Sequence, residues 1–532
     1  MSWGHITSKD LISWTTSATP ALLPDRPYDK DGVFTGCVVP PNYSQKGSLS
    51  VIYSSVRGLP FHWSSPPYPR NAAGLAIAES SDSGVTWSKS TKNPILLGEP
   101  EDIKVTGFRD PFLAEWPAMD RLFHQSSLYG FVSGGIEGQG PTIFLYSVQP
   151  DNVCNWSYLA PLVSMPRRFQ PSPKWSGNFG MNWECANWLA LGSGQNNRTC
   201  LIIGAEGDVE RDHIRDFKSR SPVPPRTVRS LLWMFGDLKS NNNLPSLTYT
   251  HSGYLDCGSL YAANSFFDPV SKRHIMHAWI PEEDIPAGYA NKKGWNGALA
   301  IPRELFLLTI ENVFRSLKGP LREIASIDAI QQPNGLTAIY TLGIRPIQEV
   351  SRLRALCVHH HEWKSLPLSS TTQNLCSTAF PSWDLHGVIS IDPNHCQEVG
   401  FYVRHSDDMS TYTTVTFSLR NETISVDREK SCNDATVRNC PEEGPFTLFY
   451  TRDFSTDEQS ENLENLHIRI ISDGDVLEVY ANDRFALATM VYSPDYASPT
   501  GISVFGSGYP GSAVVEELNV WDGLPKCVGV HS

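Results

Sequence analysis

Short apolar segments bounded by turn residues recur throughout the first part of the chain. Residues 49–54, 142–147 and 201–204 are examples, and Gly, Pro, Asn or Asp flanks each of them. Sustained helical periodicity is hard to find, so the pattern predicts an all-β fold. Short strands repeated over residues 1–315 fit a β-propeller better than a single sandwich.

The pattern changes around residues 310–355. Short helical turns are possible at 313–318 and 349–356, with irregular chain between them. Apolar and polar residues then alternate, as in a sheet with one buried face, in segments 400–404, 412–419, 466–471 and 476–480. We therefore predict a propeller over residues 1–315, a linker over 316–345 and a β-sandwich over 346–532.

Residues 80–87 match the Asp-box hairpin, Ser-x-Asp-x-Gly-x-Thr-Trp, which recurs in sugar-processing propellers. Asp82 can accept hydrogen bonds from the amides of the turn, and Gly84 can supply a positive φ. Trp87 is expected to pack under the blade. We expect a structural role for this hairpin.

Composition narrows the class of protein. Hydrophobic residues make up 40% and charged residues 19%, which is typical of a globular protein. The net charge of -13 argues against nucleic acid or an anionic membrane as the main partner, because both require a basic face. The sequence contains no stretch of about 18 apolar residues, so it predicts no transmembrane helix. The 11 cysteines are odd in number, and Cys432 and Cys440 could form a loop disulfide or remain two free thiols.

Several kinds of chemistry lack a signature in the sequence. The run His359–His361 resembles a metal-ligand cluster, but successive residues of a strand point to opposite faces, which favours a solvated linker. Neither a phosphate-binding glycine loop nor a serine-hydrolase elbow is found. We expect no metal and no cofactor. Carboxylates in aromatic surroundings remain, and these are typical of a glycosidase.

Two carboxylates stand out on those terms. Asp110 lies between Arg109, which can keep it ionised, and Pro111, which fixes the local backbone. Glu184 lies among Met181, Trp183 and Cys185, and burial there would raise its pKa, as a proton donor requires. For each, the alternative is a surface turn or a satisfied buried acid.

The two segments together resemble the "RDP" and "EC" motifs of glycoside hydrolase family 32, the invertases, inulinases and fructosyltransferases. Residues 3–11 are similar to the "WGHATS.DL" segment of that family, and residues 33–37 are similar to its "FTG" loop. The resemblance runs nearly end to end, because further family segments match residues 60–63, 67–70, 133–135, 255–262, 294–305 and 515–524.

The resemblance implies a five-bladed propeller with a funnel-shaped active site, joined to a β-sandwich. The family cleaves fructosides with retention, using an Asp nucleophile and a Glu acid/base roughly 5 Å apart. By resemblance, Glu184 is the acid/base, Asp110 is the transition-state stabiliser and Arg109 orients Asp110. Sucrose or a fructo-oligosaccharide would be the substrate, and a homodimer formed through the sandwich is possible.

The resemblance also assigns the surroundings of the substrate. The fructose pocket would be lined by Phe34, Thr35, Gly36, His62 and Trp63. The rim, where glucose or an acceptor sugar binds, would carry Glu282, Glu283 and Trp295.

One family feature has no counterpart in this chain. The nucleophile motif precedes the "WGH" segment in the family, and here that segment starts at residue 3. No Asp-Pro pair precedes Arg109. The early aspartates do not replace the nucleophile, because they lie within or after the segment that should follow it; they are Asp10, Asp25, Asp29 and Asp31. We expect an incomplete first blade and weak or no sucrose hydrolysis, since loss of a nucleophile removes most of the rate.

Three interpretations of this departure compete. The chain is a truncated fungal-type invertase, a protein that binds fructosides without cleaving them, or a pocket turned to another reaction. The first is favoured, because the acid/base, the stabiliser and the rim motifs are all present. Secreted and cytoplasmic locations both stay open, because any signal peptide would lie in the missing segment.

Overall fold

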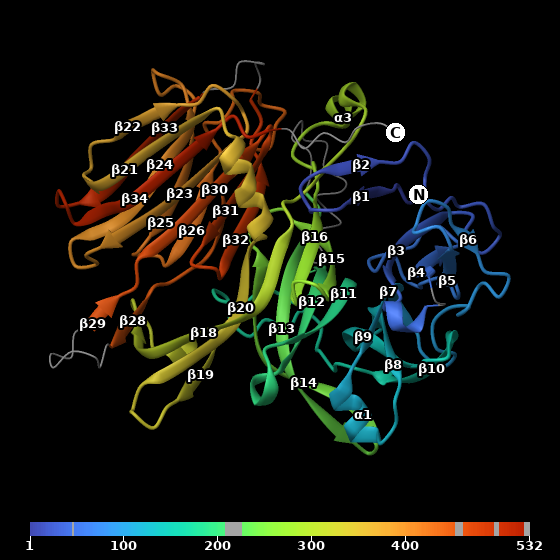
Figure 1. Ribbon diagram of the computed structural model, residues 1–532. Coiled ribbons are helices and arrows are strands. Elements are labelled where there is room, and N and C mark those ends of the chain that lie inside the picture. Colours follow the sequence, from blue (N-terminus) through green and yellow to red (C-terminus); the bar gives the residue numbers. More distant parts are fainter. Residues whose placement is uncertain (45–46, 208–225, 453–460, 494–499, 526–532) are drawn as a thin grey trace.

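The computed structural model describes residues 1–44, 47–207, 226–452, 461–493 and 500–525 (Figure 1). Strands dominate, as the sequence predicts. In these ranges the α-helices are short, with α1 at Pro117–Phe123 and α3 at Ala287–Lys293, and the 3-10 turns are Pro41–Tyr43, Gly194–Asn196, Leu321–Glu323 and Gln348–Leu356. Within the described part of the chain, no helix is both long and apolar enough to cross a membrane.

The N-terminal half is a series of antiparallel sheets, each made by consecutive strands. The first has two strands, β1 (Ile6–Ser8) and β2 (Trp14–Thr16). The next three have four strands each. One of these contains β3 (Gly32–Val38), β4 (Leu49–Val56), β5 (Ala73–Ser80) and β6 (Ser88–Lys89). The next contains β7 (Val105–Glu115), β8 (Leu128–Ile136), β9 (Gly140–Gln149) and β10 (Asn152–Pro161). The last contains β11 (Asn182–Leu191), β12 (Arg198–Glu206), β13 (Arg229–Asn241) and β14 (Leu244–Asp256).

Another sheet follows, and it extends past the predicted propeller boundary. It contains β15 (Tyr261–Asp268), β16 (Arg273–Ile280), β17 (Ala298–Leu299), β18 (Arg303–Ser316), β19 (Asp328–Gln331) and β20 (Thr337–Pro346), with β28 (Phe449–Arg452) and β29 (Glu461–Leu463) added beside β18. The segment 316–345, predicted to be an irregular linker, thus holds β19 and most of β20; β20 pairs with β18, and β19 pairs with β20. The buried apolar residues of β20 explain this pairing, because they complete the sheet.

The first strands of successive sheets lie next to one another. β7 contacts β3 and β11, and β11 contacts β15. Because each sheet starts at this centre and proceeds outward, side chains from distant parts of the sequence meet there. Asp110 on β7 and Glu184 on β11 are two of them.

The C-terminal region is a sandwich of two six-stranded sheets, as predicted. One contains β21 (His359–Pro367), β34 (Ala513–Asp522), β23 (Trp383–Ile391), β30 (Leu466–Asp473), β31 (Val476–Ala481) and β32 (Phe485–Met490). The other contains β22 (Gln373–Ser377), β33 (Gly501–Gly508), β24 (Cys396–His405), β25 (Thr413–Ser418), β26 (Thr423–Asp427) and β27 (Glu442–Pro445). Alternate residues of β25 and β26 are buried between the sheets, which follows from the alternating sequence pattern.

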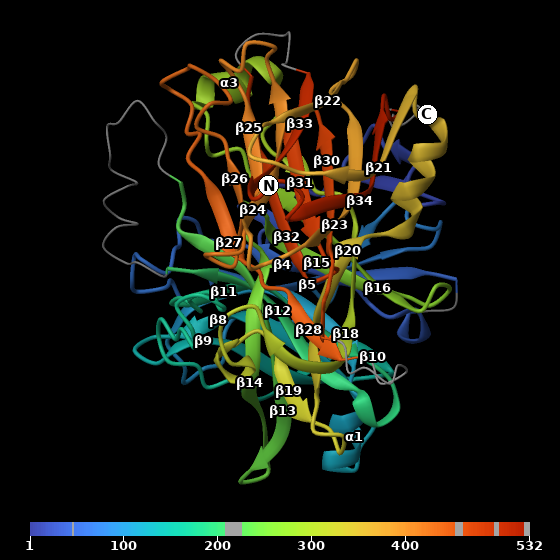
Figure 2. The same cartoon turned by 90° about the vertical axis from the view of Figure 1, so that its left-hand side faces the viewer.

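Propeller and sandwich pack through a shared core, and Figure 2 views the molecule from the sandwich side. Ile275 and Leu305 of the propeller cluster with Ala486 and Met490 of the sandwich. Arg303 is fully buried at this junction. Its guanidinium donates to Asp256 at 2.8 Å and to Glu478 at 2.9 Å, which ties β14 and β18 to β31.

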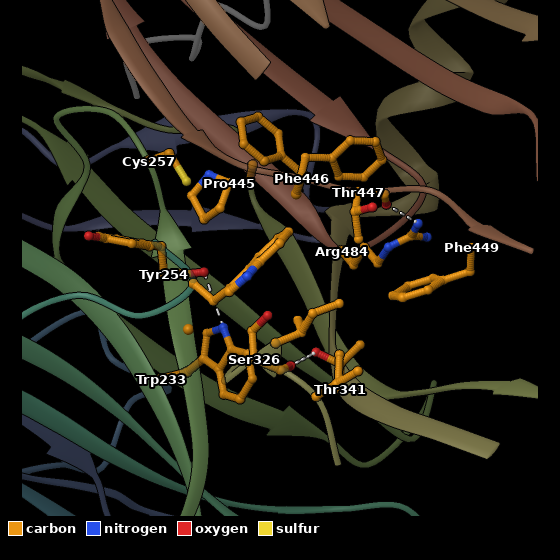
Figure 3. Close-up of a pocket in the computed structure, with 16 residues that line it drawn as sticks. Trp233, Tyr254, Cys257, Ser326, Thr341, Pro445, Phe446, Thr447, Phe449 and Arg484 are labelled. Carbon is orange, nitrogen blue, oxygen red and sulfur yellow. Dashed lines mark hydrogen bonds between the residues drawn. The ribbon is translucent and has the colours of Figure 1, made fainter. Parts of the chain in front are cut away.

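The junction also encloses a cavity of about 50 Å³ (Figure 3). Trp233 and Tyr254 of the propeller line it together with Phe446 and Arg484 of the sandwich. Its polar groups have partners within the protein: Trp233 Nε1 donates to the Tyr254 carbonyl at 3.1 Å, and Arg484 donates to the Thr447 carbonyl at 2.9 Å. None of the predicted site residues lines this cavity, so it is a packing gap at the junction.

The Asp-box hairpin joins β5 to β6 and has the predicted geometry. Asp82 accepts a hydrogen bond from the Thr86 amide at 2.9 Å, and Gly84 has a φ of 91°. The Trp87 indole donates to the Gly84 carbonyl at 3.0 Å. Elsewhere, Cys432 and Cys440 are free thiols, which resolves the alternative that the sequence leaves open.

Candidate active site

A bulge in β7 places Asp110. The pairing with β8 shifts between Arg109 and Pro111, and Asp110 at the shift has a φ of 60°. Aspartate tolerates this left-handed backbone better than most residues, and Pro111 has no amide hydrogen to pair. The Asp110 amide donates to Ser54 Oγ at 2.6 Å. The bulge therefore holds a buried carboxylate at the centre of the propeller.

A second bulge, in β11, faces the first. The pairing with β12 shifts between Glu184 and Asn187, and Cys185 has a φ of 47°. The Cys185 amide donates to Asp110 Oδ2 at 3.0 Å, and its sulfur lies 3.6 Å from the same oxygen. Trp183 belongs to the core, where its indole donates to the Phe179 carbonyl. Left-handed backbone outside glycine is costly and collects at functional sites, so these paired bulges mark the site.

The carboxylate of Glu184 is held by two donors from other strands. Arg109 donates to Oε1 through Nε at 2.9 Å and through Nη2 at 2.5 Å. The Tyr261 hydroxyl, on β15, donates to Oε2 at 2.9 Å. Burial by itself would raise the pKa of Glu184, but Arg109 and Tyr261 outweigh it and lower that pKa. The predicted rise in its pKa is therefore wrong for the unliganded site, because the sequence does not reveal these donors.

Arg109 lies near Asp110 but donates its hydrogen bonds to other carboxylates. Its Nε lies 4.0 Å from Asp110 Oδ2, beyond hydrogen-bond distance, while its guanidinium binds Glu184 and Glu206. Burial raises the pKa of Asp110 to about 6, and the neighbouring Glu184 charge adds to this, against the opposing effect of Arg109. Arg109 thus orders the other two carboxylates.

Glu206 belongs to this group and was not predicted. It ends β12, where it pairs with Asn182 at the start of β11. Its Oε2 accepts from Asn182 Nδ2 at 2.9 Å and from Arg109 Nη2 at 3.2 Å. Burial and the Glu184 charge raise the pKa of Glu206 to about 8. The available signal was an acid at the end of an apolar strand, which a hairpin would bring back beside Glu184.

Tyr261 is another residue whose role was missed, although the sequence motif contains it. It is buried, and burial followed by the charge of Glu184 raises the pKa of its hydroxyl. The hydroxyl is therefore a donor toward Glu184. The guanidinium of Arg229 lies over its ring, 4.7 Å from the centroid.

The β3 segment predicted to line the pocket lies beside these groups. Thr35 Oγ1 is 3.8 Å from the Cys185 sulfur, and the Gly36 carbonyl accepts from Asn264 at 2.8 Å. Gly36 leaves no room for a side chain, since an added Cβ would lie 2.0 Å from the Ile52 carbonyl oxygen. The Phe34 ring packs near Phe61.

His62 and Trp63 also reach the site. His62 Nε2 lies 3.8 Å from Glu206 Oε1, and its Nδ1 lies 2.7 Å from Ser64 Oγ. Trp63 is buried against Gly207, the residue after Glu206. The loop between β4 and β5 therefore covers the Glu206 side of the carboxylate group.

The predicted rim residues separate into three positions. Glu283 accepts from Arg229 at 2.8 Å and is thereby joined to Tyr261. Glu282 is buried and accepts from Lys293 and from Tyr492 of the sandwich. Trp295 is 63% exposed, with the Lys293 ammonium 5.3 Å from its ring centroid.

The histidine run has structural partners. His360 lies 2.8 Å from Asn519 Oδ1 and stacks on Trp521 with a centroid distance of 5.2 Å. Among the residues that the structure describes, no group of three or more His, Cys, Asp or Glu side chains is arranged to hold a metal ion.

Similar proteins share both the sequence pattern and the fold. An Aspergillus kawachii β-fructofuranosidase, solved with glycerol, is 27% identical, with a TM-score of 0.85 over 99% of this chain and 89% of that one. A fructosyltransferase from A. japonicus is 25% identical, with a TM-score of 0.86 over 98% and 89% of the two chains.

Curated relatives include plant enzymes. A fructan 1-exohydrolase from Triticum aestivum is 25% identical over 78% of this chain, and the match spans 63% of the wheat protein. A fructan 6-exohydrolase from Beta vulgaris is 26% identical over 57% of this chain and 45% of the beet protein. The chain thus matches less than two thirds of the length of either relative.

Family assignment rests on matches to both parts of the chain. Residues 1–316 match the glycosyl hydrolases family 32 N-terminal domain, and residues 349–522 match the glycosyl hydrolases family 32 C terminal. Together these matches cover the propeller and the sandwich. The chain belongs to glycoside hydrolase family 32.

Proposed function

We propose that this chain binds the β-fructofuranosyl group of sucrose or a fructan at Asp110 and Glu184 and acts on it as a retaining glycoside hydrolase. The observation that supports this most is the single hydrogen-bond network that joins Arg109, Glu184 and Glu206 beside Asp110. Clustered carboxylates with different pKa values are the equipment that acid/base cleavage of a glycoside requires.

Glu184 is proposed as the acid/base. In the unliganded site Arg109 and Tyr261 keep it ionised, so a sugar must weaken the contact with Arg109 before Glu184 can carry a proton. It would then protonate the leaving oxygen and afterwards activate water or an acceptor sugar. The pKa of Asp110, about 6, leaves that group largely ionised at neutral pH, where it can stabilise positive charge on the fructosyl ring.

The surrounding residues are proposed to bind the sugars. Phe34, Thr35 and Gly36 would contact the fructosyl group from β3, and His62 and Trp63 from the adjoining loop. Glu206 and Glu283 would lie toward the leaving group. Glu282 is not assigned to the sugar, because it is buried against Lys293 and Tyr492.

We further propose that this chain hydrolyses sucrose weakly. The early aspartates are engaged away from Glu184: Asp10 binds its own turn, Asp25 and Asp29 pair with Lys89, and Asp31 accepts from the Leu59 amide. Asp110 is itself bound by the Cys185 amide. Fructoside binding without cleavage is the second candidate, favoured by the ionised state of Glu184 in the unliganded site.

We also propose that the N-terminal domain is a five-bladed propeller with an incomplete first blade. The two-stranded sheet β1–β2 would belong to the first of five blades, and it has fewer strands than the three four-stranded sheets that follow. The domain boundary near residue 345 stays a prediction, since β18 to β20 form one sheet.

Sucrose hydrolysis and sucrose binding by this chain, measured beside an upstream extension that supplies an Asp-Pro strand, test the proposal. We expect binding by both and rapid fructose release only by the extended chain. Ordinary hydrolysis rates in the short chain would contradict the weak-activity proposal. Absence of binding in both would contradict the assignment of the site.

A further inference from the structure

The segment Glu282–Asp284, three consecutive acids after β16, lies where the propeller meets the sandwich. We name it the acidic triplet. Its first member, Glu282, accepts from the Lys293 ammonium at 2.6 Å and from the Gly297 amide at 2.8 Å. The hydroxyl of Tyr492, which follows β32, donates to it at 3.3 Å. Glu282 therefore fixes one end of the triplet to the α3 loop and to the sandwich.

The last member, Asp284, is fixed to the sandwich more firmly. Arg428, which follows β26 and is 1% exposed, donates to Asp284 Oδ2 at 2.9 Å. The same guanidinium donates to the carbonyls of Met490 at 2.6 Å and Cys440 at 3.0 Å. Three acceptors at fixed positions use the fork of an arginine, and a lysine ammonium could not reach all of them. Arg428 thus joins the triplet to β32 and to the loop that precedes β27.

The middle member, Glu283, faces the active site. Its carboxylate accepts from Arg229 Nη2 at 2.8 Å and from the Thr227 amide at 3.1 Å. Arg229 in turn lies on the Tyr261 ring, whose hydroxyl donates to Glu184 at 2.9 Å. A continuous series of direct contacts therefore runs from the sandwich to the carboxylate of Glu184.

We propose that Arg428 of the β-sandwich is a positioning residue for Glu184. It holds the acidic triplet so that Glu283 keeps Arg229 against Tyr261 and Tyr261 keeps its hydroxyl on Glu184. This inference rests on the proposed function, in which Glu184 exchanges a proton with the bound fructoside.

The contacts predict in which direction the protonation midpoint of Glu184 should shift when Glu283 is altered. Glu283 neutralises Arg229, and Arg229 is one of the charges that lower the pKa of Glu184. If Glu283 is removed or withdrawn, the unneutralised Arg229 should lower the protonation midpoint of Glu184 further. The other charged or titratable groups facing Glu184 are Arg109, Asp110, Cys185, Glu206 and Tyr261.

Sucrose binding measured by calorimetry from pH 2 to pH 7 is the test, because it does not require turnover and the range extends below the ordinary pKa of a glutamate. The midpoint that disappears in Glu184→Gln reports the protonation of Glu184. We expect Glu283→Gln to move that midpoint down by about 0.5 pH unit, the effect of one unneutralised charge at this range. We expect Arg428→Lys to move it in the same direction.

Two controls separate positioning from stability. Arg303→Lys alters an arginine that is equally buried between propeller and sandwich but does not touch the triplet. Glu304→Gln removes a carboxylate that pairs with Arg345 and lies on the same sheet as Tyr261. Whether or not these two control variants lower the melting temperature, the protonation midpoint of Glu184 should stay at its original pH in both.

The outcomes are distinct. If Arg428→Lys and Glu283→Gln lower the melting temperature but leave the midpoint at its original pH, as the controls do, Arg428 is only structural and the inference is overturned. Should Arg428→Lys fail to fold, Glu283→Gln decides alone, since its side chain is 26% exposed and tolerates substitution better. If the unaltered chain shows no sucrose binding, or no midpoint that Glu184→Gln removes, the proposed function itself fails.

Discussion

Arg109 and Arg303 are both buried arginines that bridge two carboxylates, yet their surroundings differ. At the domain junction, Arg303 binds Asp256 and Glu478, and each of these acids also accepts a backbone amide, from Ala488 and Ile301 respectively. At the active site, Arg109 binds Glu184 and Glu206 and has the third acid, Asp110, only 4.0 Å away.

The backbone differs between the two places as well. Arg303 and Glu478 lie in strands with ordinary φ, whereas Asp110 and Cys185 have φ values of 60° and 47° at bulges. The group around Arg109 has one carboxylate more than the group around Arg303, and it includes left-handed backbone; both are costs to stability. The junction is therefore arranged for stability, whereas the group around Arg109 has the costs expected of the sugar-binding site proposed above.

The largest expected effect comes from breaking the junction. Arg303→Met leaves Asp256 and Glu478 buried without their cation, which should lower the free energy of unfolding by about 3–5 kcal/mol. Urea denaturation monitored by tryptophan fluorescence measures this. A loss below about 1 kcal/mol, the size expected of an exposed pair, would show that the junction does not depend on this arginine.

A second effect concerns the pH dependence of stability at the active site. The pKa of Glu206 is raised from 4.5 to about 8, so the folded protein binds a proton there that the unfolded chain releases. Because of this, the contribution of Glu206 should lower stability as pH rises from about 4.5 to 8.

Glu206→Gln should remove that contribution and flatten the decline. Melting temperatures of the variant and the unaltered chain across this pH range test the effect, with the exposed Glu101→Gln as a control. Parallel curves for all three proteins would contradict the protonated state assigned to Glu206.

The smallest effect sharpens the role of Tyr261. Tyr261→Phe removes one donor to Glu184, which should cost about 1 kcal/mol of stability. The hydrogen bond from Tyr261 lowers the pKa of Glu184, so its loss should move the Glu184-dependent midpoint of sucrose binding to higher pH. A midpoint that stays in place would mean that Arg109 alone sets the charge of Glu184.

Much of the fold could be predicted from the sequence, because strand alternation and turn residues are local. The sandwich and the Asp-box hairpin are examples. Strands β19 and β20 were missed, since the pairing of β20 with β18 is a tertiary contact that the irregular composition conceals. The family resemblance assigned Asp110 and Glu184, but no local pattern shows that Arg109 turns toward Glu184.

The site residues that the sequence did not reveal also depend on tertiary contacts. Glu206 and Tyr261 reach Glu184 from β12 and β15, and only the folded arrangement brings them within hydrogen-bond distance of its network. The reversed shift in the pKa of Glu184 has the same origin: burial was predictable from its apolar neighbours, and the donors that outweigh it were not.

Calorimetric titration with sucrose of the unaltered chain and of Asp110→Asn tests the central claim, that this carboxylate site binds fructosides, most directly. Asparagine tolerates the left-handed backbone at this position, so the variant should fold. Loss of the charged hydrogen-bond acceptor should weaken binding by about tenfold or more. Equal affinities for sucrose in the two proteins would contradict the assignment of the site to Asp110 and Glu184.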